Sequence, residues 1–450
     1  MNLFKNTKVT LVIVSILQSV VAHASTGETY GYGSKASALG NTTLGGSTDG
    51  FASFYNPGAN STHPGFYLSF GIAFYKPSFL EIKNVVIDNN AISTASGDVS
   101  GDVDTSSYLN HLGQAVGLSL NLGEKLKYLS FGATTSMPLE RVGYVDSGEP
   151  FKPEYFNYRA RTQRPQIYGA ISMSPFDWMH VGAGISFASS VSANTTVFAT
   201  GSSGKVSSQR LATTLKPSAS PYFSLYFDPK PIEVAAVLRL ANTYKFSVDT
   251  VAKASFLGPT ADLPITLTSS GMLYYDPLEF DISIAYSALT NTWLTAELDW
   301  FQYKTYEAPT LSLVSTGSVA MKNSASTLPV MRNIFVPKFG IQQDIGPVSL
   351  RTGYSYRPSP VEDNSGIGNQ VDPAKHLFTF GAGVDLQKAN ITQAKLSVDA
   401  HMQVHSLVSQ HVTKSSGNEA GTAGANKIGS PGYDIGGSIV GGGVSITACF

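Results

Sequence analysis

The stretch Lys395-Leu396-Ser397-Val398-Asp399-Ala400-His401-Met402-Gln403-Val404-His405 alternates strictly between polar and apolar side chains. Successive side chains of a β-strand point to opposite faces, so this pattern predicts a strand with one polar face and one apolar face. The same period of two residues runs through 116–122, 294–300 and 444–450. A soluble β-sandwich would alternate in the same way, so periodicity alone leaves the class of β-protein open.

The composition favours a β-protein that does not act through its net charge. Of the 450 residues, 42% are hydrophobic and 14% are charged, and the formal net charge is -1. The chain holds 43 Gly, 22 Tyr and 24 Phe, which suits many strands, tight turns and aromatic surfaces. We therefore expect no nucleic-acid partner, and the single cysteine, Cys449, excludes a disulfide within the chain.

Residues 1–24 have the pattern of a secretory signal peptide. Lys5 and Lys8 precede an apolar run at 9–21, and Ala22-His23-Ala24 offers a cleavage site of small residues. A membrane anchor is the alternative, but a helix needs about 20 apolar residues to cross a bilayer and this run is shorter. No second apolar run of spanning length follows, so a membrane-spanning mature chain is expected to be a closed β-barrel.

The connections between strands follow the alternation of an outer-membrane barrel, in which short periplasmic turns alternate with long outer loops. After a first strand near 65–76, long connections are expected at 86–106, 140–160, 191–208, 248–263, 307–328, 358–375 and 409–433, and short ones at 123–126, 174–178, 228–231, 289–292, 344–347 and 387–392. Asp276-Pro277 would break this order as a turn, so 264–287 is interpreted as one long strand with an irregularity. The result is a prediction of about 14 strands, with the C-terminus on the periplasmic side.

Several stretches resemble the FadL/TodX family of outer-membrane transporters of long-chain fatty acids and hydrocarbons. Gly33-Ser34-Lys35-Ala36-Ser37-Ala38-Leu39-Gly40 and the segment 49–59 are similar to the N-terminal plug, or hatch, of that family. The signature residues of the second segment are Asp49, Asn56, Pro57 and Gly58, and Gly58 stands where the family has alanine. The strand 293–306, the run 350–356, Pro358-Ser359-Pro360, Asn364, Asp372, His376 and 380–383 resemble later parts of the family's barrel.

The resemblance implies an all-β transmembrane antiparallel barrel at 63–450, with residues 25–62 as a plug inside the lumen. It implies passive uptake of a hydrophobic small molecule, with long-chain fatty acids expected, and sideways release through a kinked third strand. The expected place is the outer membrane of a Gram-negative bacterium, where membrane lipid and lipopolysaccharide surround a monomer. The barrel-assembly machinery is expected to act on the strand that ends at Phe450, and no cofactor, metal or enzymatic activity is expected.

Pro138 is the candidate for the kink in the third strand, expected at 127–138. Proline has no N–H to donate to a strand ladder, so it could break the wall of the barrel at this point. The alternative of equal weight is that Pro138 simply ends the strand at the outer rim.

Four arginines are candidates for binding a ligand carboxylate: Arg159, Arg161, Arg164 and Arg351. Structural ion pairs with lumen carboxylates such as Glu297 or Asp299 are the alternative for each. An arginine on the lipid face costs about 2–4 kcal/mol near the bilayer midplane, so Arg351, which alternates with apolar neighbours, is expected to face the lumen.

Three other functions are compatible with a barrel. A porin for polar solutes needs no plug, and a plug-like N-terminus therefore argues against it. A lipid-acting enzyme could use His401 and His405, which share one strand face, but no Gly-x-Ser-x-Gly motif accompanies them. A surface adhesin would use its outer loops, whose Ser, Thr, Gly and Asn content carries no information about a partner.

Overall fold

The computed structural model describes residues 26–62, 65–89, 98–105, 108–122, 129–140, 152–158, 162–200, 208–255, 263–308, 310–315, 330–364, 368–414 and 428–450. The expected signal peptide, 1–24, lies outside these residues. In the described part of the chain, no helix is both long enough and apolar enough to span a membrane.

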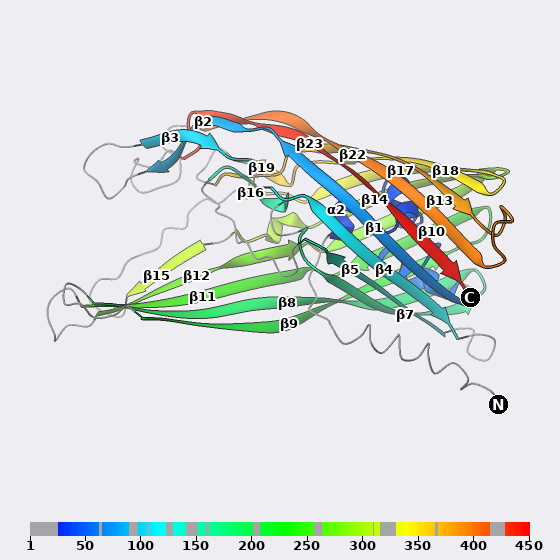
Figure 1. Ribbon diagram of the computed structural model, residues 1–450, viewed down its shortest axis with the longest axis horizontal. Helices are drawn as coiled ribbons and strands as arrows, with labels where there is room; N and C mark the ends of the chain where they lie inside the picture. Colours follow the sequence, from blue (N-terminus) through cyan, green and yellow to red (C-terminus); the bar gives the residue numbers. More distant parts are fainter. Residues whose placement is uncertain are drawn as a thin grey trace.

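Fourteen antiparallel strands form a closed ring, which confirms the predicted barrel (Figure 1). In ring order they are β1 (Phe66–Phe79), β4 (His111–Asn121), β5 (Leu129–Pro138), β7 (Gln166–Phe176), β8 (Met179–Thr200), β9 (Ser208–Phe227), β10 (Ile232–Arg239), β13 (Glu279–Leu289), β14 (Thr292–Phe301), β17 (Ile334–Ile345), β18 (Val348–Arg357), β21 (Lys375–Asp385), β22 (Lys395–Thr413) and β23 (Gly432–Cys449). The last strand pairs with the first from Tyr67↔Cys449 to Phe79↔Gly437, so the ring has no free edge at this seam.

The alternation of the strands sends apolar side chains outward. On β1, Phe70 is 45% exposed, whereas Ser69 is fully buried toward the lumen. On β22, the strand predicted first, Met402 is 49% exposed while Gln403 and His405 are fully buried. An apolar outer face around a polar interior is the arrangement that a bilayer requires of a barrel.

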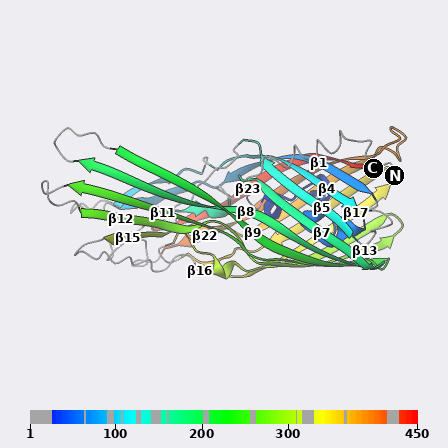
Figure 2. The same ribbon diagram turned by 90° about the horizontal axis from the view of Figure 1, so that it is seen from below.

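The long connections depart from the expected loops in two places. In the connections expected at 191–208 and 248–263, the described residues are strand, because β8 continues to Thr200 and the strand that starts at Asn242 continues to Ser255. Together with β11 (Asn242–Ser255), β12 (Leu263–Asp276) and β15 (Thr310–Ser315), β8 and β9 form an extension beyond the ring (Figure 2). Outside the lipid, strands can pair through their backbone hydrogen bonds without an apolar face. The polar sequence that suggested loops therefore forms strands here.

The strand expected at 264–287 is interrupted where the sequence suggested an irregularity. It consists of β12 and β13, separated by Pro277-Leu278, and its neighbour is interrupted at the same level, between β10 and β11. The remaining described elements of the connections are β2 (Ile82–Asn89), β3 (Asp98–Val103), β6 (Glu154–Tyr155), η3 (Phe156–Tyr158), η4 (Tyr303–Thr305), β16 (Val330–Met331), β19 (Val361–Asp363) and β20 (Gln370–Val371).

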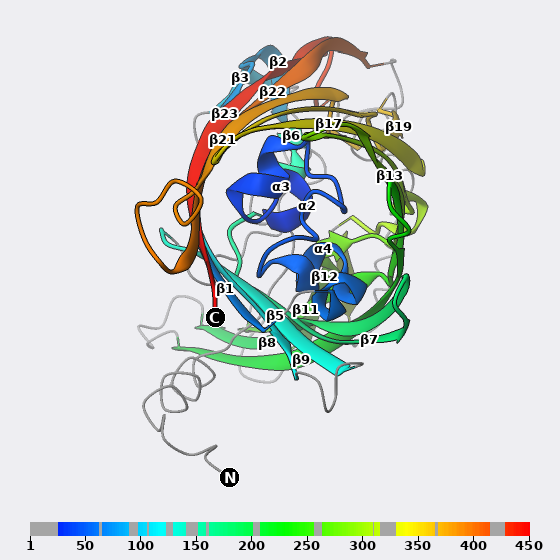
Figure 3. The ribbon, with the colours of Figure 1, turned by 90° about the vertical axis from the view of Figure 1, so that its right-hand side faces the viewer.

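Residues 26–62, called the plug from here on, lie inside the ring (Figure 3). They form the short helices α2 (Thr26–Tyr30), α3 (Ser34–Ala38), α4 (Ala52–Tyr55) and η1 (Pro57–Ser61). Helix α3 is bounded by Gly33 and Gly40, whose φ angles of 72° and 73° lie in the left-handed region that favours glycine. Helix α3 packs against β21 and β22, α4 against β4 and β5, and η1 against β7 and β8.

Candidate functional site

The signature residues of the plug dock it against the wall. Gly58 donates its backbone N–H to Ser224 Oγ on β9 at 2.7 Å. It also faces Gly182 on β8, where an added Cβ would lie 2.3 Å from Gly58 N. The two backbones can approach this closely only because neither residue carries a side chain.

The other signature residues shape the plug itself. Asp49 is 5% exposed, and its Oδ1 accepts the backbone N–H of Phe51 at 2.9 Å, a local turn that leads into α4. Burial raises the pKa of the Asp49 carboxyl to about 6. Asn56 is fully buried, and Pro57 starts η1, where a missing N–H does no harm.

A cavity separates part of the plug from the wall formed by β1, β4, β5, β22 and β23. This cavity, called the plug-side cavity, presents mostly apolar surface. Its lining includes Tyr32, Ser34 and Ser37 of the plug and Tyr75, His111, Ala115, Ser136, Met137 and His401 of the wall.

The polar groups around this cavity mostly bond to one another. His401 Nε2 contacts the hydroxyl of Tyr75 at 2.8 Å, and His401 Nδ1 contacts Ser34 Oγ at 2.9 Å. Ser136 Oγ lies 3.0 Å from the hydroxyl of Tyr32. His405, considered above for an enzyme site, is fully buried and contacts Gln403 Oε1 at 3.2 Å. The two histidines thus take part in plug and wall contacts.

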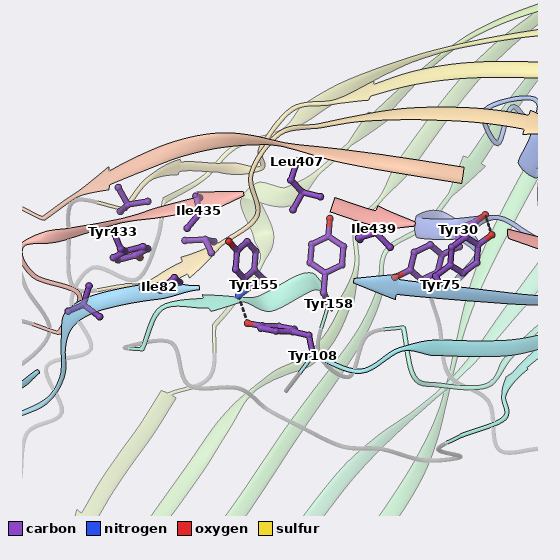
Figure 4. Close-up of a cluster of buried hydrophobic side chains, with 13 residues drawn as sticks. Tyr30, Tyr75, Ile82, Tyr108, Tyr155, Tyr158, Leu407, Tyr433, Ile435 and Ile439 are labelled. Atoms are coloured by element: carbon purple, nitrogen blue, oxygen red, sulfur yellow. Dashed lines mark hydrogen bonds between the residues drawn. The ribbon is translucent and has the colours of Figure 1, made fainter. Parts of the chain in front are cut away.

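An aromatic cluster leads from the long-connection end of the barrel to the plug (Figure 4). This outer aromatic cluster contains Tyr30, Tyr75, Ile82, Val85, Tyr108, Tyr155, Tyr158, Val371, Leu407, Val412, Tyr433, Ile435 and Ile439. Tyr30 of the plug stacks on Tyr75 of β1, with ring centroids 4.1 Å apart. Farther out, Phe79 stacks on Tyr155 at 4.3 Å. Tyr75 also lines the plug-side cavity, so the cluster and the cavity adjoin.

Sequence reasoning did not single out these tyrosines. They come from the plug, β1, the connections and β23, and their abundance was the only signal in the sequence. A tyrosine on the outer girdle and a tyrosine facing the lumen have the same local pattern, so only the fold separates them.

Pro138 is the last residue of β5, the third strand of the ring. It is buried and stands opposite Gly113 in the register with β4. The pairing of β5 with β7 ends two residues earlier, at Ser136↔Gln166. Pro138 therefore lies where β5 loses its second neighbour, directly after two residues that line the plug-side cavity.

Two of the four candidate arginines have defined surroundings, since Arg159 and Arg161 lie outside the described residues. Arg164 is fully buried and forms an ion pair with Asp276 at 2.7 Å. Arg351 is 7% exposed, and its Nη1 lies 2.6 Å from Asp399 Oδ1. Arg164 thus pairs with a carboxylate of β12 and Arg351 with one of β22, and within the described residues neither pairs with Glu297 or Asp299.

On the side of the plug away from the plug-side cavity, charged wall residues bond to the plug. Arg239 on β10 donates to the backbone oxygens of Phe54 and Tyr55 at 2.8 and 3.1 Å. Lys338 on β17 donates to the backbone oxygen of Asn41 at 3.0 Å. Arg357 on β18 pairs with Glu28 of the plug at 3.2 Å.

Solved structures share this fold over nearly the whole chain. A Pseudomonas aeruginosa FadL homologue is 13% identical over 93% of this chain and 98% of its own, with a TM-score of 0.55. The Pseudomonas putida toluene transporter TodX is 12% identical over 94% and 99%, with a TM-score of 0.51. The CymD monoaromatic hydrocarbon channel is 10% identical over 93% and 97%, with a TM-score of 0.50.

No family model and no curated protein sequence matches this chain. The structural likeness at this level of identity extends to the fold, which is the FadL/TodX-type fold that the sequence resemblance implied.

Proposed function

We propose that this protein, a barrel of the FadL/TodX-type fold, is an outer-membrane transporter for passive uptake of hydrophobic small molecules, with long-chain fatty acids as the expected ligands. One observation carries the proposal: the outer aromatic cluster and the plug-side cavity adjoin at Tyr75, so buried apolar and aromatic side chains extend from the long connections to the cavity. An apolar molecule gains by moving between apolar surfaces and gains little in a water-filled pore. Solved neighbours named as a toluene transporter and a monoaromatic hydrocarbon channel support this ligand class.

The proposed exit is lateral, through the wall beside β5. Ser136 and Met137 line the plug-side cavity, and the pairing between β5 and β7 ends at Ser136. A ligand that leaves here enters the apolar layer outside the ring, where Phe131 of the same strand is 42% exposed. This route keeps an apolar ligand out of water.

The apolar outer face supports the proposed surroundings. We place the ring in the outer membrane of a Gram-negative bacterium, with membrane lipid and lipopolysaccharide around it and one chain per barrel. The strand that ends at Phe450 closes the ring against β1, and we propose it as the segment that the barrel-assembly machinery engages.

An uptake assay tests the proposal. The protein is expressed in a Gram-negative strain that lacks its own transporters of this fold, and uptake of labelled palmitate, toluene and glucose is compared. We expect palmitate uptake to rise and glucose uptake to stay unchanged. Ala115→Phe should lower palmitate uptake several-fold, because Ala115 lines the plug-side cavity and the larger side chain fills it.

Ala235→Phe is the matched control. Ala235 is also a buried wall residue, but it packs in a different cluster, with Leu44, Ala52 and Ala59 of the plug. Barrel assembly of both variants is checked by the gel mobility of unheated samples. Glucose uptake that rises with expression, or palmitate uptake that Ala115→Phe leaves intact while Ala235→Phe abolishes it, would contradict the proposed route.

A further inference from the structure

Three carboxylates converge on the side of the plug away from the plug-side cavity. Glu279 and Asp281 lie on β13, and Asp299 lies on β14 directly opposite Asp281 in the register. One oxygen of each carboxylate lies within 4.8 Å of the other two. Asp281 and Asp299 are 2% and 0% exposed, so this is a buried cluster.

The carboxylates here outnumber the cationic side chains that contact them in the described part of the chain. Arg239 forms ion pairs with Glu279 and Asp281. Lys338 lies 2.6 Å from Asp299 and 2.8 Å from the neighbouring Glu297. Four carboxylates therefore contact two cationic side chains among the described residues. Arg357 and Lys375, which line a cavity beside the cluster, bond to Glu28 and Tyr158. A buried charge without compensation costs several kcal/mol, and a bound cation or a proton on one of the carboxylates offsets that cost.

Two carboxylates of the cluster line the same cavity and have an oxygen atom without a hydrogen-bond partner in the part of the chain that is described. Asp281 Oδ1 and Asp299 Oδ1 have no hydrogen-bond partner among the described residues. The cavity that both residues line is between the plug and the wall.

A residue of the plug adds an independent observation. Asn41 lines this cavity and is 7% exposed, and its side-chain Oδ1 also lacks a hydrogen-bond partner within the described ranges. Its backbone oxygen accepts from Lys338 Nζ at 3.0 Å, which places Asn41 beside the wall cluster. A buried amide oxygen without a donor is a group that a cation would satisfy.

We infer that Glu279, Asp281 and Asp299 of the wall, together with Asn41 of the plug, bind one Ca²⁺ ion. Carboxylate and amide oxygens are the ligands that Ca²⁺ takes, about six to eight at a time, and water can complete the set. The double charge of the ion offsets the negative charge of the cluster. The bound ion joins the plug to β13 and β14, so its removal loosens the plug. The inference rests on this cluster and not on the proposed transport function.

Terbium luminescence tests the site on the purified full-length protein in detergent. Tb³⁺ replaces Ca²⁺ in oxygen sites, and Tyr55, which lines the same cavity, can sensitise its emission. After treatment with a chelator, we expect one saturable Tb³⁺ site that Ca²⁺ displaces. Asp281→Asn combined with Asp299→Asn should abolish this signal, whereas Asp385→Asn with Asp434→Asn, two carboxylates outside the cavity, should keep it.

A melting experiment separates ion binding from a general structural role. The Asp281→Asn/Asp299→Asn variant loses two repelling charges, so in chelator it should melt no lower than the wild type. Added Ca²⁺ should raise the melting temperature of the wild type and leave that of the variant unchanged. A wild type that binds neither Tb³⁺ nor Ca²⁺, or a variant that binds them equally well, would overturn the inference whatever the uptake assay shows.

Discussion

At the residue scale, docking of the plug depends on two glycines, Gly58 and Gly182, whose lack of a side chain lets the two backbones approach closely. A Cβ at Gly182 would lie 2.3 Å from Gly58 N and 2.5 Å from Pro57 C, and both are backbone atoms that cannot rotate away. Gly182→Ala should therefore destabilise plug docking by about 1–3 kcal/mol, the usual effect of overpacking. Faster protease cleavage of the plug, with the barrel still folded in unheated gels, is the expected measurement.

Gly58→Ala is the control for this prediction. It restores the alanine of the family signature, and its Cβ would meet Ser224 Oγ at 3.1 Å and the backbone oxygen of His180 at 3.3 Å, both farther away than the backbone atoms that a Cβ at Gly182 would meet. A hydroxyl at this distance can shift by a few tenths of an ångström, so the plug should remain protected. Equal cleavage of the two variants would mean that the close approach of Gly58 and Gly182 does not limit docking.

For the candidate arginines, the sequence predicts which way a side chain faces but not which carboxylate it pairs with. Arg351 alternates with apolar neighbours, which predicts that its side chain faces the lumen. The side chain of Arg351 is buried there. Its partner Asp399 lies two strands away in the ring, because β21 runs between β18 and β22. The ion pair passes over Gly383 of β21, where a Cβ would lie 2.0 Å from Asp399 Oδ1. Such a pairing depends on the register of three strands, which periodicity does not fix.

At the element scale, the sequence predicts strands best where lipid imposes a pattern. The ring strands alternate because one face meets the bilayer, and the count of about 14 follows from their turns. The sequence predicts loops at 191–208 and 248–263, where β8 and β11 instead continue as strands, since no bilayer requires apolar alternation there. The plug resembled a family motif, but its contacts with the wall come from segments distant in sequence.

The end of β5 carries a prediction of its own. Pro138→Val gives the strand a backbone N–H and a β-branched residue, both of which favour continued pairing beyond Ser136. If the lateral exit lies here, palmitate uptake should fall while barrel assembly stays normal. Pro77→Val is the matched control, because Pro77 lies in β1, is paired with Ile439 of β23 and does not line the plug-side cavity. Unchanged uptake in the Pro138 variant would count against a gate at this point.

At the scale of the whole molecule, two kinds of interaction differ in strength. A closed ladder of backbone hydrogen bonds holds the ring, and no ring strand between β1 and β23 lacks a partner in the described residues. The plug is attached by separate side-chain contacts, such as those of Arg239, Lys338 and Arg357. Because a denaturant solvates such local contacts before it opens a cooperative barrel, the plug should leave first.

This difference predicts a stepwise response in planar bilayers. The intact protein should show no large steady conductance, because the plug occupies the lumen (Figure 3). Rising urea should open a large conductance that reverses on dilution, at concentrations where unheated gels still show a folded barrel. A large steady conductance without urea would favour a porin for polar solutes. Loss of the conductance step together with barrel unfolding would show that plug and ring form one cooperative unit.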